Sequence, residues 1–202
     1  MLVIDCPMNH LLMILIQFVF MWVPTLISLN PSGGVPTGCV FSALMMAITM
    51  GGVLFPPLQS LFSVVGSKAT APEASAAFIY LLGSISMAIP ALCLSGMYFT
   101  ETDYFNKIIA SFLVMEFSVG LFMPVAGTLR SKYIPDFLQG AILNIFRLPL
   151  NVVVVVGTYA TDHMPHSEVY KGVSICLLLA ALLQASLIIG ASGISASKVK
   201  KE

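Results

Sequence analysis

The stretch FLVMEFSVGLFMPVAGTLRSKYIPDFLQGAILNIFRLPLN, Phe112–Asn151, decides the fold of this 202-residue chain. It joins two apolar runs, extending over 105–128 and 137–160, through a short basic segment that contains Arg130 and Lys132. At 1.5 Å per residue, each run is long enough to cross the ~30 Å hydrocarbon core of a membrane as a helix. The stretch therefore predicts an antiparallel hairpin of two membrane-spanning helices.

The rest of the chain repeats this pattern. Hydrophobic residues make up 58% and charged residues 9%, against ~45–50% and ~25% in soluble domains. This composition excludes a water-soluble globule, a disordered chain and a nucleic-acid binder with a basic face. No strand-like alternation typical of a barrel is present. We predict an all-α polytopic membrane protein, a single membrane domain over residues 1–202, with six spans at about 10–28, 37–63, 75–98, 105–128, 137–160 and 170–192.

Breaks in the apolar pattern divide these spans. The expected connectors are short and rich in Pro and Gly, and include Arg130–Pro135 and Thr161–Ser167. The second span is long and carries Pro56-Pro57, so we expect it to kink or end there.

The positive charges indicate the orientation. One predicted side of the membrane holds six of the nine Lys and Arg residues: Lys68, Arg130, Lys132, Lys198, Lys200 and Lys201. The other side holds Lys107 and Lys171, and Arg147 lies inside a span. Because positive loops stay cytoplasmic, both termini are predicted to be cytoplasmic.

Two charged residues lie well inside the predicted spans, Glu116 in the fourth and Arg147 in the fifth. Charge at this depth is costly and usually functional. With the turn centred near Ser131-Lys132, both residues lie about 15 positions from it and reach the same depth, where they can pair directly.

Polar and small residues extend this pair along two helix faces. Gly140, Asn144, Arg147 and Asn151 follow a spacing of 4, 3 and 4, so they share one face of the fifth predicted span. A matching line on the fourth span joins Glu116, Gly120 and Pro124. Candidate substrate-binding or coupling residues are Glu116, Asn144, Arg147 and Asn151, and candidates for helix packing or gating are Gly120, Pro124, Gly140 and Pro149. A guanidinium fork suits an oxyanion, but a structural ion pair that joins two helices is the alternative.

Motifs of other functional classes are absent from the sequence. The four cysteines, Cys6, Cys39, Cys93 and Cys176, are widely spaced and form no metal-ligand pattern with histidine. No nucleophile elbow, zinc-protease, phosphate-loop or dinucleotide-binding motif is present. We predict that the chain is not an enzyme and uses no cofactor and no metal.

The same stretch also carries a resemblance. Glu116, Gly120 and Pro124, the basic loop ending in Ile134-Pro135, and the run Asn144-Ile-Phe-Arg147-Leu-Pro149-Leu resemble the molybdate-anion transporter family of the major facilitator superfamily. The resemblance implies that these spans are the C-terminal six-span half of a carrier in the plasma membrane. It implies secondary-active transport of a small anion, molybdate, by alternating access, with substrate bound between two halves.

A half of such a carrier needs a partner. The expected partner is a missing N-terminal half or a second copy of the chain, besides the lipid bilayer and the anion. Three origins remain open: a fragment of a longer protein, a half-size transporter that dimerises, or a degenerate product. The alternative function is a truncated, non-transporting membrane interaction protein or regulator of a full-length carrier.

Replacing Arg147 with lysine tests the oxyanion role. Arg147→Lys keeps the charge but loses the two parallel hydrogen bonds of the fork, so we expect anion affinity to fall ~10–100-fold. Concentration-dependent anion uptake measures this change, with Lys171→Arg as the control outside the spans. Unchanged uptake by Arg147→Lys would exclude the oxyanion role.

Overall fold

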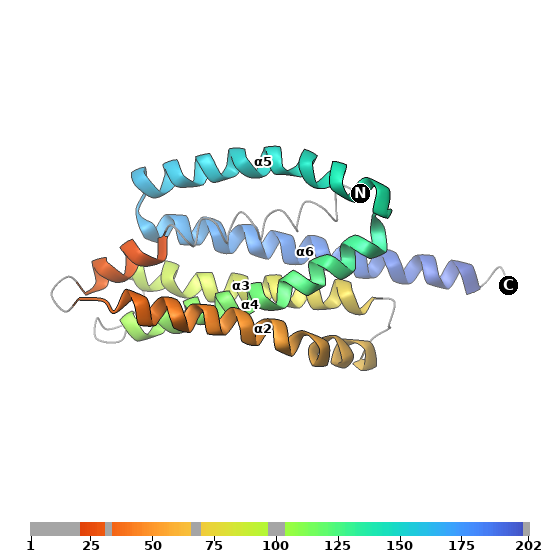
Figure 1. Cartoon of the computed structure of the whole chain (residues 1–202), viewed down its shortest axis with the longest axis horizontal. Coiled ribbons are helices and arrows are strands. Elements are labelled where there is room, and N and C mark those ends of the chain that lie inside the picture. The colour runs from red at the N-terminus through yellow and green to blue at the C-terminus, as the bar shows by residue number, and fades with distance from the viewer. Residues whose placement is uncertain (1–20, 31–33, 66–69, 97–103, 200–202) are drawn as a thin grey trace.

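The computed structural model describes residues 21–30, 34–65, 70–96 and 104–199, without the side chains of 136, 142–143, 146–150, 153 and 189–199. Residues 21–29 are helical. The helices that follow are α2 (Thr37–Val65), α3 (Ala71–Leu94), α4 (Tyr104–Tyr133), α5 (Asp136–His163) and α6 (His166–Val199). Their long axes run side by side in an elongated bundle (Figure 1).

Prolines mark where three of these helices begin. Pro72 occupies the first turn of α3, and Pro135 and Pro165 directly precede α5 and α6. Proline suits these positions because the first helical N–H groups have no partner within the helix. At the other end of α3, Gly96 has a φ of 71°, a conformation that glycine adopts without strain.

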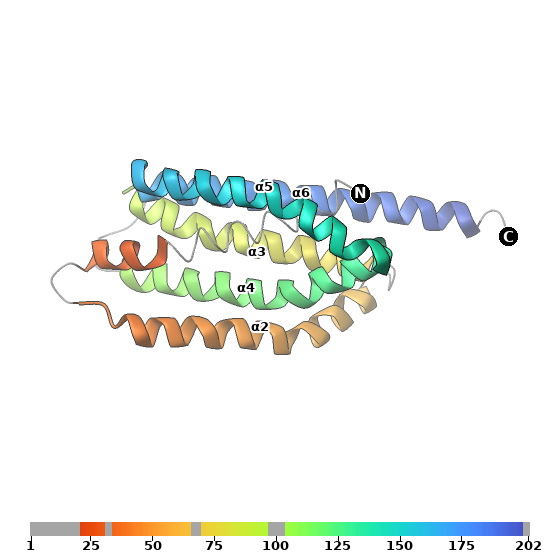
Figure 2. The same ribbon diagram turned by 45° about the horizontal axis from the view of Figure 1, so that its top comes forward.

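Two central helices, α3 and α4, hold the bundle together. α3 packs mainly against α6 and α4, and α2 packs mainly against α4. The core between them is apolar and includes Tyr80, Met87, Phe112 and Met115. α5 lies apart from this core, with few contacts, most of them to α6 (Figures 1 and 2).

The helices confirm a helical membrane protein. Within the described residues, four are long and apolar enough to cross a membrane: Thr37–Val65, Ala71–Leu94, Tyr104–Tyr133 and His166–Ile188. α5 covers the fifth predicted span as one helix but is not among these four. Most of the first predicted span, 10–28, lies outside the described residues.

Several predicted boundaries were wrong by a turn of helix. α3 begins at Ala71 rather than 75, so it includes Glu73. α4 continues to Tyr133, so most of the expected connector Arg130–Pro135 is helical. Of the two alternatives predicted at Pro56-Pro57, the kink agrees with the structure: α2 continues to Val65, and Figure 2 shows its C-terminal part turned relative to the rest.

The backbones of α2 and α4 meet at two glycines. A Cβ atom on Gly120 would lie 2.0 Å from the carbonyl oxygen of Ile48, and one on Gly51 would lie 2.2 Å from that of Phe117. These distances are far below van der Waals contact, so no side chain fits at either position. Small residues permit such close approach in membrane helices, where dispersion contacts replace the hydrophobic effect.

This contact predicts a sharp difference between two glycines of α4. Gly120→Ala forces the α2 backbone away and should destabilise the protein by ~1–3 kcal/mol. Gly127→Ala, with nothing within 4 Å of the added Cβ, should change stability by less than about 1 kcal/mol. Thermal unfolding in detergent measures both. Equal stability of the two variants would contradict the close contact.

Candidate substrate site

Glu116 lies in the middle of α4 and is 3% exposed. One helical turn before it, the ring of Phe112 contacts that of Tyr170 on α6, with centroids 5.9 Å apart. One turn after it, Gly120 contacts the backbone of α2. The carboxylate therefore lies between a contact of α4 with α6 and a contact of α4 with α2.

One oxygen of this carboxylate, Oε2, is buried and has no hydrogen-bond partner among the described residues. A buried charged group without partners is costly, because protein atoms replace the water that would solvate it. Membrane proteins retain such groups mainly where they carry ions, protons or substrate. Glu116 is thus the strongest single candidate among the described side chains.

The polar stripe predicted on the fifth span lies on α5, the helix farthest from the core. We call its residues, Gly140, Asn144, Arg147 and Asn151, the α5 stripe. Asn144 and Asn151 are exposed, and a Cβ added at Gly140 would meet no atom within 4 Å. Arg147 lies in α5, but its side chain is outside the described part of the structure, as is that of Pro149. The described side chains therefore do not assemble Glu116 and the α5 stripe into one closed site.

The position of the turn changes the expected register. α4 ends at Tyr133 and α5 begins at Asp136, so the turn is at Ile134-Pro135 and not at Ser131-Lys132. Glu116 lies 17 residues before the end of α4, whereas Arg147 lies 11 residues after the start of α5. At 1.5 Å per residue, Arg147 is on the order of 9 Å closer to the turn. By the same measure Asn151 differs from Glu116 by only ~3 Å.

Pro124, a candidate for gating, changes the hydrogen bonding within α4. Pro124 lies inside α4, where it removes one backbone donor, and its carbonyl accepts a hydrogen bond from Thr128 Oγ1 at 2.9 Å. Such back-bonding is typical of Ser and Thr in apolar helices and favours bending. Pro124 therefore divides α4 into a part fixed by α2 and a part that leads to α5.

Sequence reasoning missed a second buried carboxylate, Glu73 on α3. Its side chain is 0% exposed, and its Oε1 accepts a hydrogen bond from Lys132 Nζ at 2.5 Å and another from the hydroxyl of Tyr133. Glu73 fell just before the third predicted span, which was expected to begin at about 75. The sequence did contain a signal for this contact: Glu73 is an acidic residue on the side of the membrane where Lys68 and Lys132 were predicted to lie.

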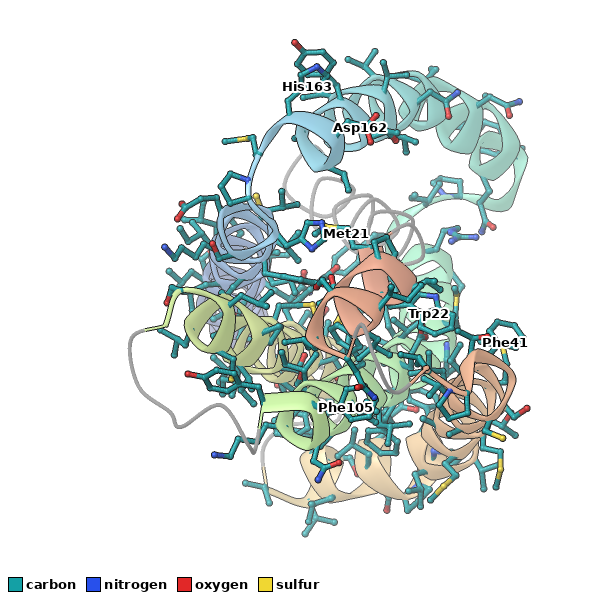
Figure 3. The ribbon with its side chains drawn as sticks, turned by 90° about the vertical axis from the view of Figure 1, so that its left-hand side faces the viewer. Met21, Trp22, Phe41, Phe105, Asp162 and His163 are labelled. Carbon is teal, nitrogen blue, oxygen red and sulfur yellow. The ribbon has the colours of Figure 1, made fainter. Side chains whose placement is uncertain are left out.

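A third polar cluster lies at the opposite end of the bundle. Thr25 Oγ1 is 3.0 Å from the hydroxyl of Tyr170 and 3.4 Å from Nδ1 of His166. His163, only three residues before His166, lies at the end of α5 and well away from Met21 and Trp22 (Figure 3). This cluster joins the start of α6 to the helical segment 21–29.

These features define a class: an integral membrane protein built of apolar helices, with buried ionisable side chains. Comparison with known protein families finds no matching family model, and no solved structure matches. Among curated proteins, the chain is similar to molybdate-anion transporters. It is 27% identical to that of Xenopus tropicalis over 84% of this chain and 36% of the relative. It is 29% identical to that of Danio rerio, over 77% of this chain and 29% of the relative.

The sequence resemblance to the molybdate-anion transporter family is therefore confirmed. A third relative, from Takifugu rubripes, is 27% identical over 157 residues. By name these relatives are transporters and not enzymes. The chain spans about a third of the length of the curated relatives it matches.

The burial of Glu116 predicts that its role is not structural. Replacing a buried ion by an apolar residue of similar volume is often neutral or stabilising, so Glu116→Met should leave the thermal midpoint unchanged or higher. Glu168→Met, at an exposed residue of α6, is the matched control. A fall of several degrees for Glu116→Met alone would show that the carboxylate holds a stabilising partner.

Proposed function

We propose that this chain forms a six-span half of a secondary-active transporter for a small oxyanion such as molybdate, with both termini in the cytoplasm. The observation that carries the proposal is Glu116, a buried carboxylate with an unpartnered oxygen at the centre of a membrane helix. The similarity to molybdate-anion transporters supports the class of substrate. The plasma membrane is the proposed location.

The distribution of charge supports the orientation. Arg130 and Lys132 lie in the last turn of α4, at the same end of the bundle as the C-terminus of the chain (Figure 1). Lys107 and Lys171 lie near the starts of α4 and α6, at the opposite end. Positive charge near the C-terminal end is what a cytoplasmic location there requires.

The anion in this proposal binds to the α5 stripe. Arg147 supplies a permanent positive charge with two parallel donors, and the amides of Asn144 and Asn151 lie one turn to either side on the same helix face. Both asparagines are exposed in this chain, so a dry cavity around the anion needs a second wall. A second six-helix half, or a second copy of the chain, provides that wall in alternating access.

Glu116 acts at a different depth in this proposal. Along the backbone, Arg147 is closer than Glu116 to the turn between α4 and α5, which supports separate roles for the two residues. We assign Glu116 the role of proton carrier, with Asn151 nearest to it in depth. Coupling then depends on protonation of Glu116, and anion affinity depends on Arg147.

Anion uptake tests this proposal directly. An immunoblot against the tail, residues 198–202, first establishes the length of the native product, which is then reconstituted in vesicles. We expect saturable uptake of radiolabelled molybdate that an inward proton gradient accelerates. Glu116→Gln should abolish the acceleration by the gradient, because the amide carries no proton across the membrane.

Two controls separate this role from misfolding. Glu168→Gln, an exposed residue paired to Lys171 within α6, should leave uptake and its proton dependence unchanged. Tungstate and sulfate as competitors define how selective the site is. Absence of molybdate uptake by the folded native product would reject the proposal, and uptake that is indifferent to Glu116→Gln would reject its coupling role.

A further inference from the structure

The start of α3 holds the end of α4 through one fully buried carboxylate. Glu73 is 0% exposed, and its Oε1 receives hydrogen bonds from Lys132 Nζ, at 2.5 Å, and from the hydroxyl of Tyr133. Both donors lie in the last turn of α4. We call Glu73, Lys132 and Tyr133 the α3–α4 latch.

Burial makes this latch specific. The second oxygen of Glu73, Oε2, has no hydrogen-bond partner within the described part of the chain. Water does not reach the carboxylate, so the two donors of α4 stabilise it instead. If these donors moved away, the buried charge would be left without a partner, which is strongly unfavourable. The carboxylate therefore favours one position of the end of α4. The exposed pair of Glu168 and Lys171, within one helix, has no such effect on a neighbouring element.

α4 is held along its length by buried side chains such as Val125 and Leu129, and two further contacts fix its middle and its end. Gly120 lies in backbone contact with Ile48 of α2, and the latch holds Lys132 and Tyr133 three turns further on. Pro124 lies between these points and breaks the continuity of the helical hydrogen bonds. Leu129 keeps the segment after Pro124 in the core, so opening of the latch would release the last turn of α4, Lys132 and Tyr133, which leads into α5.

α5 follows this segment after only two residues, Ile134 and Pro135. α5 itself has few contacts with the bundle, so its position depends on how its ends are held. Its far end is followed by Met164 and Pro165 and then by His166, which lies 3.4 Å from Thr25. A movement of the α4 end would shift the near end of α5 while the far end stays in place.

We propose that Glu73 is a positioning residue for the anion-binding stripe of α5, acting through Lys132 and Tyr133. The proposal rests on the proposed function for the role of the stripe, but the mechanical coupling from Glu73 to α5 does not depend on it. With the latch closed, Asn144, Arg147 and Asn151 are held at one distance from the α2–α4 core. With the latch broken, that distance changes.

Distances between two spin labels test the coupling without any transport assay. Cys39 on α2 is exposed and serves as one labelled site, after replacement of the other three cysteines. The second label is placed at Val152 on α5, which is 63% exposed, or at Ile85 on α3, 55% exposed, as the control pair. Pulsed electron resonance on the full chain in lipid nanodiscs gives both distances.

We expect Glu73→Gln to shift or broaden the distance from Cys39 to position 152 by ~2–5 Å, the scale of helix shifts. The distance from Cys39 to position 85 should not change. Tyr133→Phe keeps the ion pair and should give a smaller shift. The charge-swapped double variant, Glu73→Lys with Lys132→Glu, should restore the original distance, and Glu168→Gln should have no effect.

Each other outcome overturns the proposal. An unchanged α5 distance in Glu73→Gln shows that the latch does not position α5. A shift of both pairs shows that Glu73 supports the whole bundle and has no specific effect on α5. Failure of the swapped pair to restore the distance shows that the ion pair is not the cause.

A transport measurement then tests the functional consequence. If Glu73 positions the stripe, Glu73→Gln should raise the KM for molybdate several-fold with a smaller change in kcat, and the swapped pair should recover it. A fall in kcat at constant KM would contradict positioning. A distance shift in a protein whose wild type transports no anion would reject the proposed function and leave the mechanical coupling established.

Discussion

The backbone contact between α2 and α4 at Gly51 and Gly120 is the constraint on which the rest of the structure depends. In a membrane, apolar side chains gain little by leaving lipid, so close packing of helix backbones supplies much of the specificity. This contact brings one face of α4 against α2, and α3 packs against another. α4 thereby becomes one of the two central helices, and Glu116, between Phe112 and Gly120, is buried because the surrounding part of α4 is buried.

The bundle treats its two buried carboxylates differently. Glu73 lies near the end of the bundle, where donors of the last turn of α4 reach it from the basic side. Glu116 lies in the middle of α4, where one of its oxygens has no partner among the described residues. Each carboxylate has one oxygen without a hydrogen-bond partner among the described residues, but two donors of α4 hold the other oxygen of Glu73. These donors suit Glu73 to positioning, whereas in the proposed function Glu116 is the proton carrier.

Hydropathy was sufficient to predict the helices. It did not predict where they end or which residues of neighbouring helices lie at the same depth in the membrane. The apolar runs located α2 to α5 to within about a turn, because the length of a membrane helix is set by the hydrocarbon thickness. α6 continues to Val199, about two turns beyond the predicted end at 192. The helices α3 and α4 extend beyond the predicted spans and include Glu73, Arg130 and Lys132, of which Glu73 and Lys132 form an ion pair. The turn between α4 and α5 therefore lies three residues later than predicted, and this changes the depth expected for Arg147. Gly120 and Glu116 stood out in the sequence, whereas the contact of Gly120 with Ile48 required the arrangement of α2.

The loose packing of α5 follows from the composition of its polar face. A helix with Asn144, Arg147 and Asn151 along one face cannot bury that face against an apolar core without leaving donors and a charge unsatisfied. It therefore lies where a partner surface or a ligand can satisfy those groups, and it stays attached through short connections at Ile134-Pro135 and Met164-Pro165. A helix held in this way can tilt when one of its ends moves. In the proposed function, the polar face that limits the packing of α5 is also the face that binds the anion, so a change at the latch beside it reaches the binding residues.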